Sequence, residues 1–154
     1  MTVTQSLSKL PSTVVLGASH QGLQLDSTLA ELPRHHCQIS AEVLGQAIAQ
    51  MFQQHPLLPG AILMADGQFL GSLSRQRFLE VLLHPQGSCL FLSQPLSVLH
   101  SYTRHSSNLI LPVTTTIVVA AQLALRRSPQ ERNEPIVVQL DAHTYHLLDV
   151  HELN

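Results

Sequence analysis

The chain carries an internal repeat in which one order of patterns occurs twice, about 75 residues apart. Residues 43–80 contain a helical apolar pattern, a short apolar run, an Asp-Gly turn and a second short run. Residues 117–153 contain the same order, with Asp-Ala at the turn. Asp66 of the first turn aligns with Asp141 of the second. A repeat of this length constrains the architecture more than any single motif, because both copies must build the same supersecondary unit. It predicts two similar units related by a pseudo-twofold axis, with a cleft between them that suits a ligand.

Each copy is expected to contain a helix, a hairpin and the beginning of another helix. Apolar residues recur at helical spacing in the first copy, where Val43 aligns with Ile117 of the second. The hairpin turns at Gly67, which accepts the positive φ of a tight turn, and Ser74 follows as a helix N-cap. The first copy is expected to contain a helix over residues 43–52, strands over 61–65 and 69–73, and a helix over 75–83. The second is expected to contain a helix over residues 117–127, strands over 135–140 and 144–148, and a closing helix truncated at 154.

Composition along the chain divides it into an arm, two repeats and a linker. The predicted segments are an N-terminal arm over residues 1–36, a first repeat over 37–85, a linker over 86–107 and a second repeat over 108–154. The arm is rich in Ser, Thr, Gly and Gln and is expected to be partly ordered, with a short strand at 13–16 and a short helix within 23–33. The linker contains a helical pattern at 96–102. The predicted fold class is α+β, with two β-α-β-β-α repeats.

The overall composition excludes several classes of protein. Hydrophobic residues make up 44% of the chain and charged residues 12%, with a formal net charge of -2. There is no basic stripe of the kind that binds nucleic acid, no apolar run of about 18 residues that would span a membrane and no signal-peptide pattern. Cys37 and Cys89 lack metal-binding or redox spacing, so we expect reduced thiols and a cytoplasmic location. The low charge suggests that part of the surface is covered, most simply by self-association or by a neighbouring domain.

The ten histidines do not form a pattern that binds a metal. His35 and His36 are adjacent and therefore point apart in either regular structure, and His143 and His146 lie on opposite faces of the predicted strand. No cysteine or carboxylate completes a ligand set at a recognised spacing. The sequence also has no nucleophile elbow, Walker lysine or paired acid and base. We therefore expect neither a metal site nor an enzyme.

The residues around the predicted hairpins resemble a known family. The stretch GSLSRQRF at 71–78, the stretch LPVT at 111–114 and the stretch LDVHEL at 148–153 resemble those of a tandem CBS-domain pair, or Bateman module, over residues 38–154. They are similar to the divergent CBS-like module at the N-terminus of cyanobacterial signalling proteins, ahead of sensor histidine kinases, phosphatases or diguanylate cyclases. The resemblance implies a regulatory module that signals to a C-terminal output domain such as a histidine kinase.

The resemblance also implies where a ligand would bind. In nucleotide-binding members, a Ser or Thr and the helix N-terminus contact phosphate where the hairpin meets the next helix, and a carboxylate three residues later binds the ribose diol. The first such junction has Arg77 at the carboxylate position, and arginine has donors only. It favours an anion, such as an adenine nucleotide or cyclic dinucleotide. The candidate ligand-binding residues are Ser74, Arg75, Arg77, Thr114, Asp149 and Glu152. In the alternative, Ser74 is only a cap and the arginines are solvated or paired with carboxylates.

Small residues on the two long helices suggest an interface. Gly45, Ala49, Ala120 and Ala124 would allow helices to approach closely, either between the copies of one chain or across a dimer seam. CBS-like pairs commonly dimerise through their helices, so the resemblance implies a homodimer. The alternative to a ligand sensor is a dimerisation or interaction scaffold that has lost its ligand.

Overall fold

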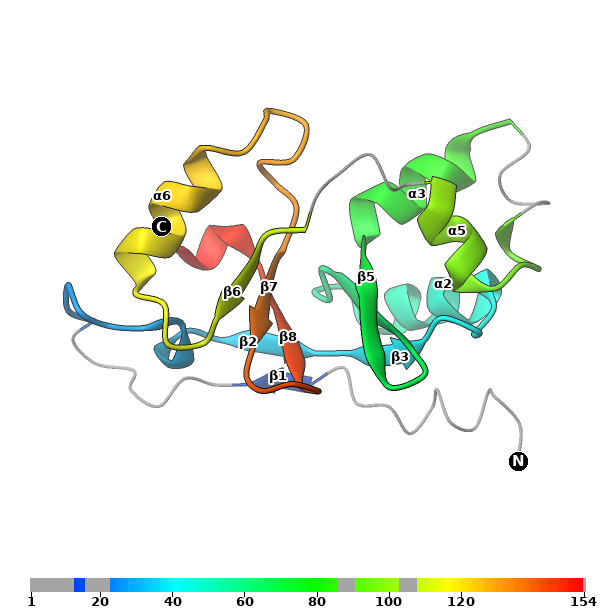
Figure 1. The fold of residues 1–154 in the computed structure, drawn as a ribbon. Helices are drawn as coiled ribbons and strands as arrows, with labels where there is room; N and C mark the ends of the chain where they lie inside the picture. Colours follow the sequence, from blue (N-terminus) through cyan, green and yellow to red (C-terminus); the bar gives the residue numbers. More distant parts are fainter. Residues whose placement is uncertain (1–12, 16–22, 86–90, 103–107, 154) are drawn as a thin grey trace.

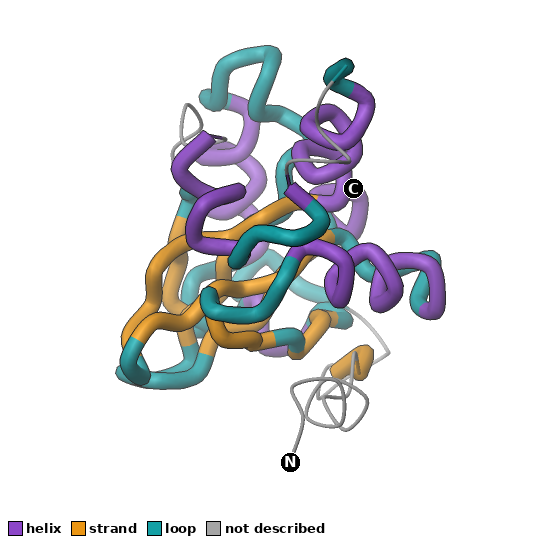
Figure 2. Tube along the Cα trace, turned by 90° about the vertical axis from the view of Figure 1, so that its right-hand side faces the viewer, coloured by secondary structure: helices purple, strands orange, loops and turns teal. Residues whose placement is uncertain are grey.

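The computed structural model describes residues 13–15, 23–85, 91–102 and 108–153 of the chain. It has two lobes that lie side by side, each with its own sheet and helices (Figure 1). The side view places most of the helices above the strands (Figure 2). None of the helices in these residues is long and apolar enough to cross a membrane. Strands and helices alternate as the repeat predicts, and the α+β fold class is confirmed.

The first lobe is built on a three-stranded sheet in the order β3-β4-β5. Its strands are β3 (Gln38–Ser40), β4 (Gly60–Ala65) and β5 (Gln68–Ser74), and its helices are α2 (Gly45–Gln54), α3 (Arg75–Leu83) and α5 (Leu96–Tyr102). Strands β3 and β4 are parallel, whereas β4 and β5 are antiparallel. They are joined through Asp66 and Gly67, whose φ angles are 55° and 76°. Positive φ at both positions is the geometry of a two-residue hairpin turn, so the predicted turn is confirmed.

The second lobe is built on a five-stranded sheet in the order β1-β2-β8-β7-β6. Its strands are β1 (Thr13–Val15), β2 (Arg34–His36), β6 (Ile110–Pro112), β7 (Ile136–Gln139) and β8 (Tyr145–Leu148), and its helices are α6 (Ile117–Leu125) and the 3-10 helices η1 (Leu29–Glu31) and η2 (Val150–Leu153). Strands β6 and β7 are parallel, and β7 and β8 are antiparallel. The second lobe therefore repeats the order of the first.

The two hairpins confirm the predicted repeat register. In the first hairpin Ala61 lies opposite Leu73, and in the second Ile136 lies opposite Leu148. Ala61 and Ile136 are 75 positions apart, and so are Leu73 and Leu148, which is the spacing that aligns Asp66 with Asp141 in the sequence. Strand–helix junctions are thus equivalent in the two lobes, and we use this equivalence below.

The helices, in contrast, align differently from the prediction. The Gly45 amide donates to the Gln94 carbonyl at the start of α2, and the Ile117 amide donates to the Ser27 carbonyl at the start of α6. Gly45 is therefore the structural partner of Ile117, and the predicted pairing of Val43 with Ile117 is wrong by two residues. The loop between helix and hairpin is longer in the second repeat, so no single spacing aligns both elements.

The segment that precedes β3 belongs to the second lobe. Leu29 and Leu32 are buried in the core of that lobe, and the Leu29 amide donates to the Thr115 carbonyl. Leu96, in α5, makes the equivalent backbone bond in the first lobe, to Val43. The chain thus contributes its N-terminal strands and η1 to the second lobe, then builds the first lobe, and then returns to build the rest of the second. Residues 27–36 are part of this packing, whereas the sequence placed them in a partly ordered arm.

A third apolar cluster joins the two lobes. Its buried members are Ile62, Val137, Tyr145 and Leu147. The Phe69 ring of β5 lies against the Tyr145 ring of β8, with 4.8 Å between the ring centroids. These contacts hold the two sheets together at their centre, so the lobes form one packed unit with their strand–helix junctions on the same side.

The four residues of the predicted dimer seam are used within the chain. Gly45, Ala120 and Ala124 are buried, and Ala49 packs against the core of the first lobe. A Cβ at position 45 would lie 2.3 Å from the Phe91 carbonyl oxygen. Their small size serves close packing inside each lobe, and a dimer seam over these residues stays a prediction.

A buried arginine and a buried histidine link η1, β2 and β8. The Arg34 guanidinium donates through Nη1 to the carbonyls of Leu29 and Leu32, at 2.8 and 2.9 Å. Its Nε donates to His146 Nδ1 at 3.2 Å, so this imidazole accepts and is neutral. Burial, with smaller contributions from the charges of Arg34 and His36, lowers the pKa of His146 to about 4. The neutral histidine lets the arginine charge be buried.

Acid is therefore expected to destabilise the fold through His146. The unfolded chain binds a proton at this residue near its ordinary pKa of about 6.5, whereas the folded chain binds it only near pH 4. Stability is fully present above about pH 6.5 and falls by about 2 to 3 kcal/mol as the pH falls toward 4. Urea unfolding at several pH values measures this loss. In His146→Gln, which does not titrate, the same interval should show a clearly smaller slope; an unchanged slope would contradict the assignment.

Candidate functional site

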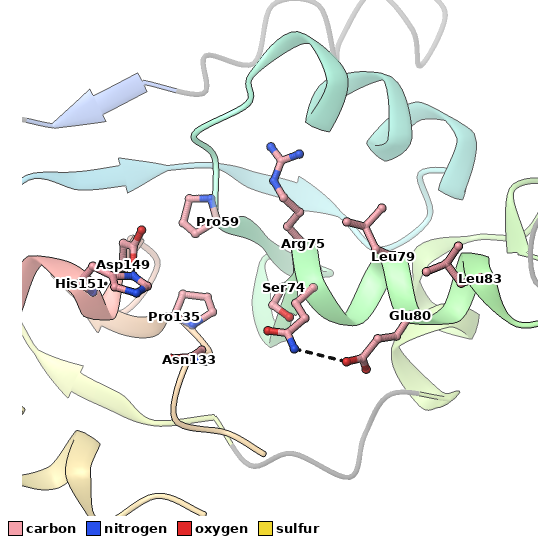
Figure 3. A pocket seen from close by; sticks show the side chains of 11 residues that line it. Pro59, Ser74, Arg75, Leu79, Glu80, Leu83, Asn133, Pro135, Asp149 and His151 are labelled. Carbon is pink, nitrogen blue, oxygen red and sulfur yellow. Dashed lines mark hydrogen bonds and ion pairs between the residues drawn. The ribbon is translucent and has the colours of Figure 1, made fainter. Parts of the chain in front are cut away.

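A cleft of about 640 Å³ lies between the lobes, where the two strand–helix junctions face each other (Figure 3). One wall is α3 and the end of β5, and the facing wall is the loop before β7 and the turn after β8. The residues that line it are Pro59, Ser74, Arg75, Gln76, Leu79, Glu80, Leu83, Asn133, Pro135, Asp149 and His151. Leu79 and Leu83, one helical turn apart on α3, give the cleft an apolar side next to its polar centre.

Ser74 and Asp149 occupy equivalent positions in the two junctions, and both cap the helix that follows. Ser74 Oγ accepts from the Arg77 amide at 3.0 Å. Asp149 Oδ1 accepts from the His151 amide at 3.0 Å and lies 2.7 Å from His151 Nδ1. The structure brings both predicted residues to the cleft. Their oxygens already satisfy helix N-termini, as the capping alternative expected.

Arg75 lines the cleft, but its guanidinium is turned away from the second lobe, toward the end of α2 (Figure 3). Its Nε donates to the Leu58 carbonyl at 2.9 Å and its Nη1 to the Phe52 carbonyl at 3.0 Å, while Nη2 donates to the His55 carbonyl. The guanidinium also lies 4.7 Å from the centroid of the Phe52 ring. These partners use the donors with which arginine would bind an anion. Arg75 therefore holds α2, α3 and the loop between them together.

Arg77 joins the two lobes through an ion pair. Its Nε donates to Glu134 Oε1 at 2.7 Å, and the Glu134 side chain is almost completely buried. Its Nη1 lies 3.6 Å from Glu80 on the next turn of α3. Because Glu134 is buried, loss of Arg77 would leave an unpaired carboxylate there, which is strongly disfavoured. Arg77 does not line the cleft and is held by two carboxylates.

Two other predicted site residues lie outside the cleft. Thr114 is exposed and follows β6, whose last residue pairs with Gln139 at the far end of β7. Asp149 follows β8 at the opposite end, where Leu148 pairs with Ile136. Thr114 is thus separated from Asp149 by the length of a strand. Because β6 runs parallel to β7, it ends beside the C-terminal end of β7, whereas the junction lies beside the N-terminal end. Glu152 is exposed on η2 and does not line the cleft.

The charge that remains in the cleft is negative. Burial alone would raise the pKa of Asp149, but hydrogen bonds from the backbone and side chain of His151 outweigh it and lower the pKa. Asp149 is therefore an ionised carboxylate at neutral pH, and Glu80 contributes a second carboxylate to the same space. Of the two nearby guanidinium groups, that of Arg75 is bound to backbone carbonyls and that of Arg77 to Glu134, with Glu80 at 3.6 Å. This arrangement accepts hydrogen bonds from hydroxyl or amino groups and disfavours added phosphate charge.

Several cleft residues were not predicted. Pro59 and Pro135 precede the first strand of each hairpin, and Asn133, Leu79 and Leu83 complete the walls. The only signal in the sequence was the recurrence of proline before each hairpin. Among the described residues, no three His, Cys, Asp or Glu side chains are grouped as a metal site.

Comparisons with known proteins identify the fold. No protein-family model matches the chain, and no curated protein matches it in sequence. Solved structures do match. A CBS-domain protein of Agrobacterium tumefaciens, ATU1752, has a TM-score of 0.59 at 15% identity, over 78% of this chain and 87% of that one. The putative acetoin utilization protein AcuB of Vibrio cholerae has a TM-score of 0.61 at 10% identity, over 84% and 87%.

A third match, CBSX2, was solved in complex with AMP. It has a TM-score of 0.50 at 14% identity, over 84% of this chain and 89% of that one. These structures share the architecture described above. The chain therefore has the fold of a tandem CBS-domain pair, as the resemblance in the sequence implied.

Proposed function

We propose that this tandem CBS pair is a regulatory module, not an enzyme, and that it binds an adenosine-type small molecule in the cleft between its lobes. The observation that carries the proposal is the cleft itself, in which both strand–helix junctions and an apolar wall surround a space of about 640 Å³. A space of this size is in the range of small-molecule sites. The AMP complex of CBSX2, a protein of the same fold, supports an adenine-containing ligand.

The engaged arginines refine the ligand that the sequence suggested. A small anion was expected because Arg75 and Arg77 stand at the first junction. In the structure Arg75 is bound to backbone carbonyls and Arg77 to Glu134, while the carboxylates of Glu80 and Asp149 face the cleft. These carboxylates suit ribose hydroxyls and an exocyclic amino group. We therefore propose the nucleoside part of an adenine nucleotide as the recognised element.

Signalling would follow from the position of the cleft. A ligand that touches both walls binds best at one angle between the lobes, and it can shift the protein only toward the arrangement that it binds more tightly. Within the described residues, the ion pair of Arg77 with Glu134 spans the same two walls and would report that angle. The signal would pass to an output domain, for which a histidine kinase is the sequence-based candidate.

Thermal unfolding with adenosine, AMP, ADP and ATP tests the proposed ligand. We expect adenosine and AMP to raise the Tm and each further phosphate to weaken the effect, because charge is added next to two carboxylates. A ligand at 100 times its Kd adds about 2.7 kcal/mol. The shift should disappear in Gln76→Trp, which fills the cleft, and persist in Gln122→Trp on exposed α6. No shift with any of the four compounds, or the strongest shift with ATP, would contradict the proposal.

A second candidate function is a scaffold that dimerises without a ligand. Helix α6 favours it, because Val118, Val119 and Leu125 expose between 41% and 69% of their surface. A cluster of exposed apolar side chains on one helix is typical of an interface. Light scattering tests it. Wild type should be dimeric at micromolar concentration and Val118→Lys monomeric, with Gln53→Lys at an exposed position on α2 as the control. A monomeric wild type would exclude this function.

A further inference from the structure

A second, smaller hollow lies in the second lobe, between α6, η2 and the loop before β7. Its volume is about 220 Å³. Its lining residues are Ala121, Ala124, Leu125, Arg132, Asn133, Val150, His151 and Leu153. Asn133 and His151 also line the larger cleft, so the two spaces are neighbours with a shared wall. Five of the lining residues are aliphatic, and three have polar side chains.

The first lobe shows what fills the equivalent space there. In the helix register, where Gly45 is equivalent to Ile117, Phe52 is equivalent to Ala124. In the register of the hairpins and junctions, Arg75 is equivalent to Val150 and Phe78 to Leu153. In the first lobe the Phe52 and Phe78 rings pack edge to face, with 5.4 Å between centroids. The Arg75 guanidinium covers the other side of Phe52 at 4.7 Å. That space is therefore occupied by an aromatic ring held between a second ring and a cation.

In the second lobe each of these side chains is replaced by a smaller one. Alanine stands in place of Phe52, valine in place of Arg75 and leucine in place of Phe78, while Asn133 stands in place of the buried Leu58. Removing a phenyl ring and a guanidinium from a packed space leaves a hollow unless the backbone closes around it. The 220 Å³ that remain show that this lobe has not closed. The hollow is the space of an absent aromatic side chain.

We propose that this hollow binds a small molecule through a flat aromatic ring, in the place that Phe52 takes in the first lobe. An enclosed apolar cavity of about 150 Å³ takes up benzene in a protein where it was engineered, and this open, partly polar hollow offers a comparable space for one ring. The volume suits one ring system and is too small for a helix, so the proposed occupant is a small molecule. Asn133, His151 and Arg132 in the lining would select a heteroaromatic ring with hydrogen-bonding atoms. This site goes beyond the adenosine cleft and does not depend on it.

Indole is a suitable probe, because it is flat, bicyclic and carries one donor. Methyl resonances of alanine and leucine in the complete chain should show a saturable shift on indole addition, centred on Ala121, Ala124 and Leu153, with a Kd on the order of 1 mM. Ala124→Phe rebuilds the first-lobe arrangement and should abolish the shift. Ala142→Phe, in the exposed turn of the second hairpin, adds the same ring elsewhere and should leave it unchanged.

The outcomes separate clearly. No saturable shift up to the solubility limit of indole, or a shift that survives in Ala124→Phe, would overturn the proposal. If Ala124→Phe does not fold, Leu153→Phe fills the same hollow from η2 and must abolish the shift in its place. The indole titration is repeated with saturating adenosine. An unchanged Kd for indole is expected, and an absence of any adenosine binding would leave the indole result standing.

Discussion

Replacing Arg75 with methionine is expected to lower the free energy of unfolding by about 3 kcal/mol. The substitution keeps much of the aliphatic stem and removes the group that donates to the carbonyls of Phe52, His55 and Leu58. Hydrogen bonds from charged groups contribute about 1.5 to 3 kcal/mol each, and the contact with the Phe52 ring adds about 0.5 to 1 kcal/mol. Compensation by water at this partly exposed site reduces the sum. Urea unfolding of the variant and wild type measures the loss.

The matched control for this prediction is Arg75→Lys. A lysine keeps the charge but has no planar fork, so it can reach one of the three carbonyls at a time and should recover only part of the loss. Gln76→Met, at the exposed neighbouring position, should change stability by less than about 0.5 kcal/mol. Unchanged stability in Arg75→Met, together with weaker ligand binding, would show that Arg75 is the ligand-binding residue that the sequence suggested.

Replacing Leu29 with alanine is expected to destabilise the chain by about 3 kcal/mol. Leu29 is 0% exposed, although it lies in the segment that composition marks as an arm. Truncation of a fully buried leucine removes its transfer free energy and leaves a cavity, at a total of about 2 to 5 kcal/mol. Denaturant unfolding of Leu29→Ala gives the measured value.

Leu25→Ala is the control for the Leu29 prediction. Leu25 lies four residues earlier and is 85% exposed, so its truncation should be nearly neutral. Similar small effects at both positions would mean that residues before β3 are an arm after all. A large effect at Leu29 alone would establish that the second lobe depends on a segment that precedes the first lobe in the sequence.

The hairpins and their turns could be predicted because the signals for them are local. Gly67 supplies the positive φ of the first turn, and apolar residues at strand spacing flank the turn in both copies. The second hairpin closes with a longer loop, between Gln139 and Tyr145. Ser74 and Asp149 were predicted as caps from their position after a strand, and both cap in the structure. Such features depend on neighbours within a few residues. The tandem CBS fold follows from their repetition, and the solved structures confirm it.

The pairing of Arg77 with Glu134 could not be predicted in the same way. The two residues are 57 positions apart, and only the packing of one lobe on the other brings them together. The burial of Leu29 depends likewise on α6, which comes much later in the chain. The sequence therefore showed which residues stand at the first junction, but not that their donors are engaged. That difference changes the expected ligand from an anion to a nucleoside.

The most direct test of the account is to map adenosine on the protein by amide chemical shifts. The account predicts a saturable titration in which the largest changes fall on Ser74, Gln76, Asn133 and Asp149, from both walls of the cleft. Addition of inorganic phosphate alone should leave these amides unchanged. Changes confined to one lobe, or a phosphate titration that matches that of adenosine, would contradict a nucleoside site between the lobes.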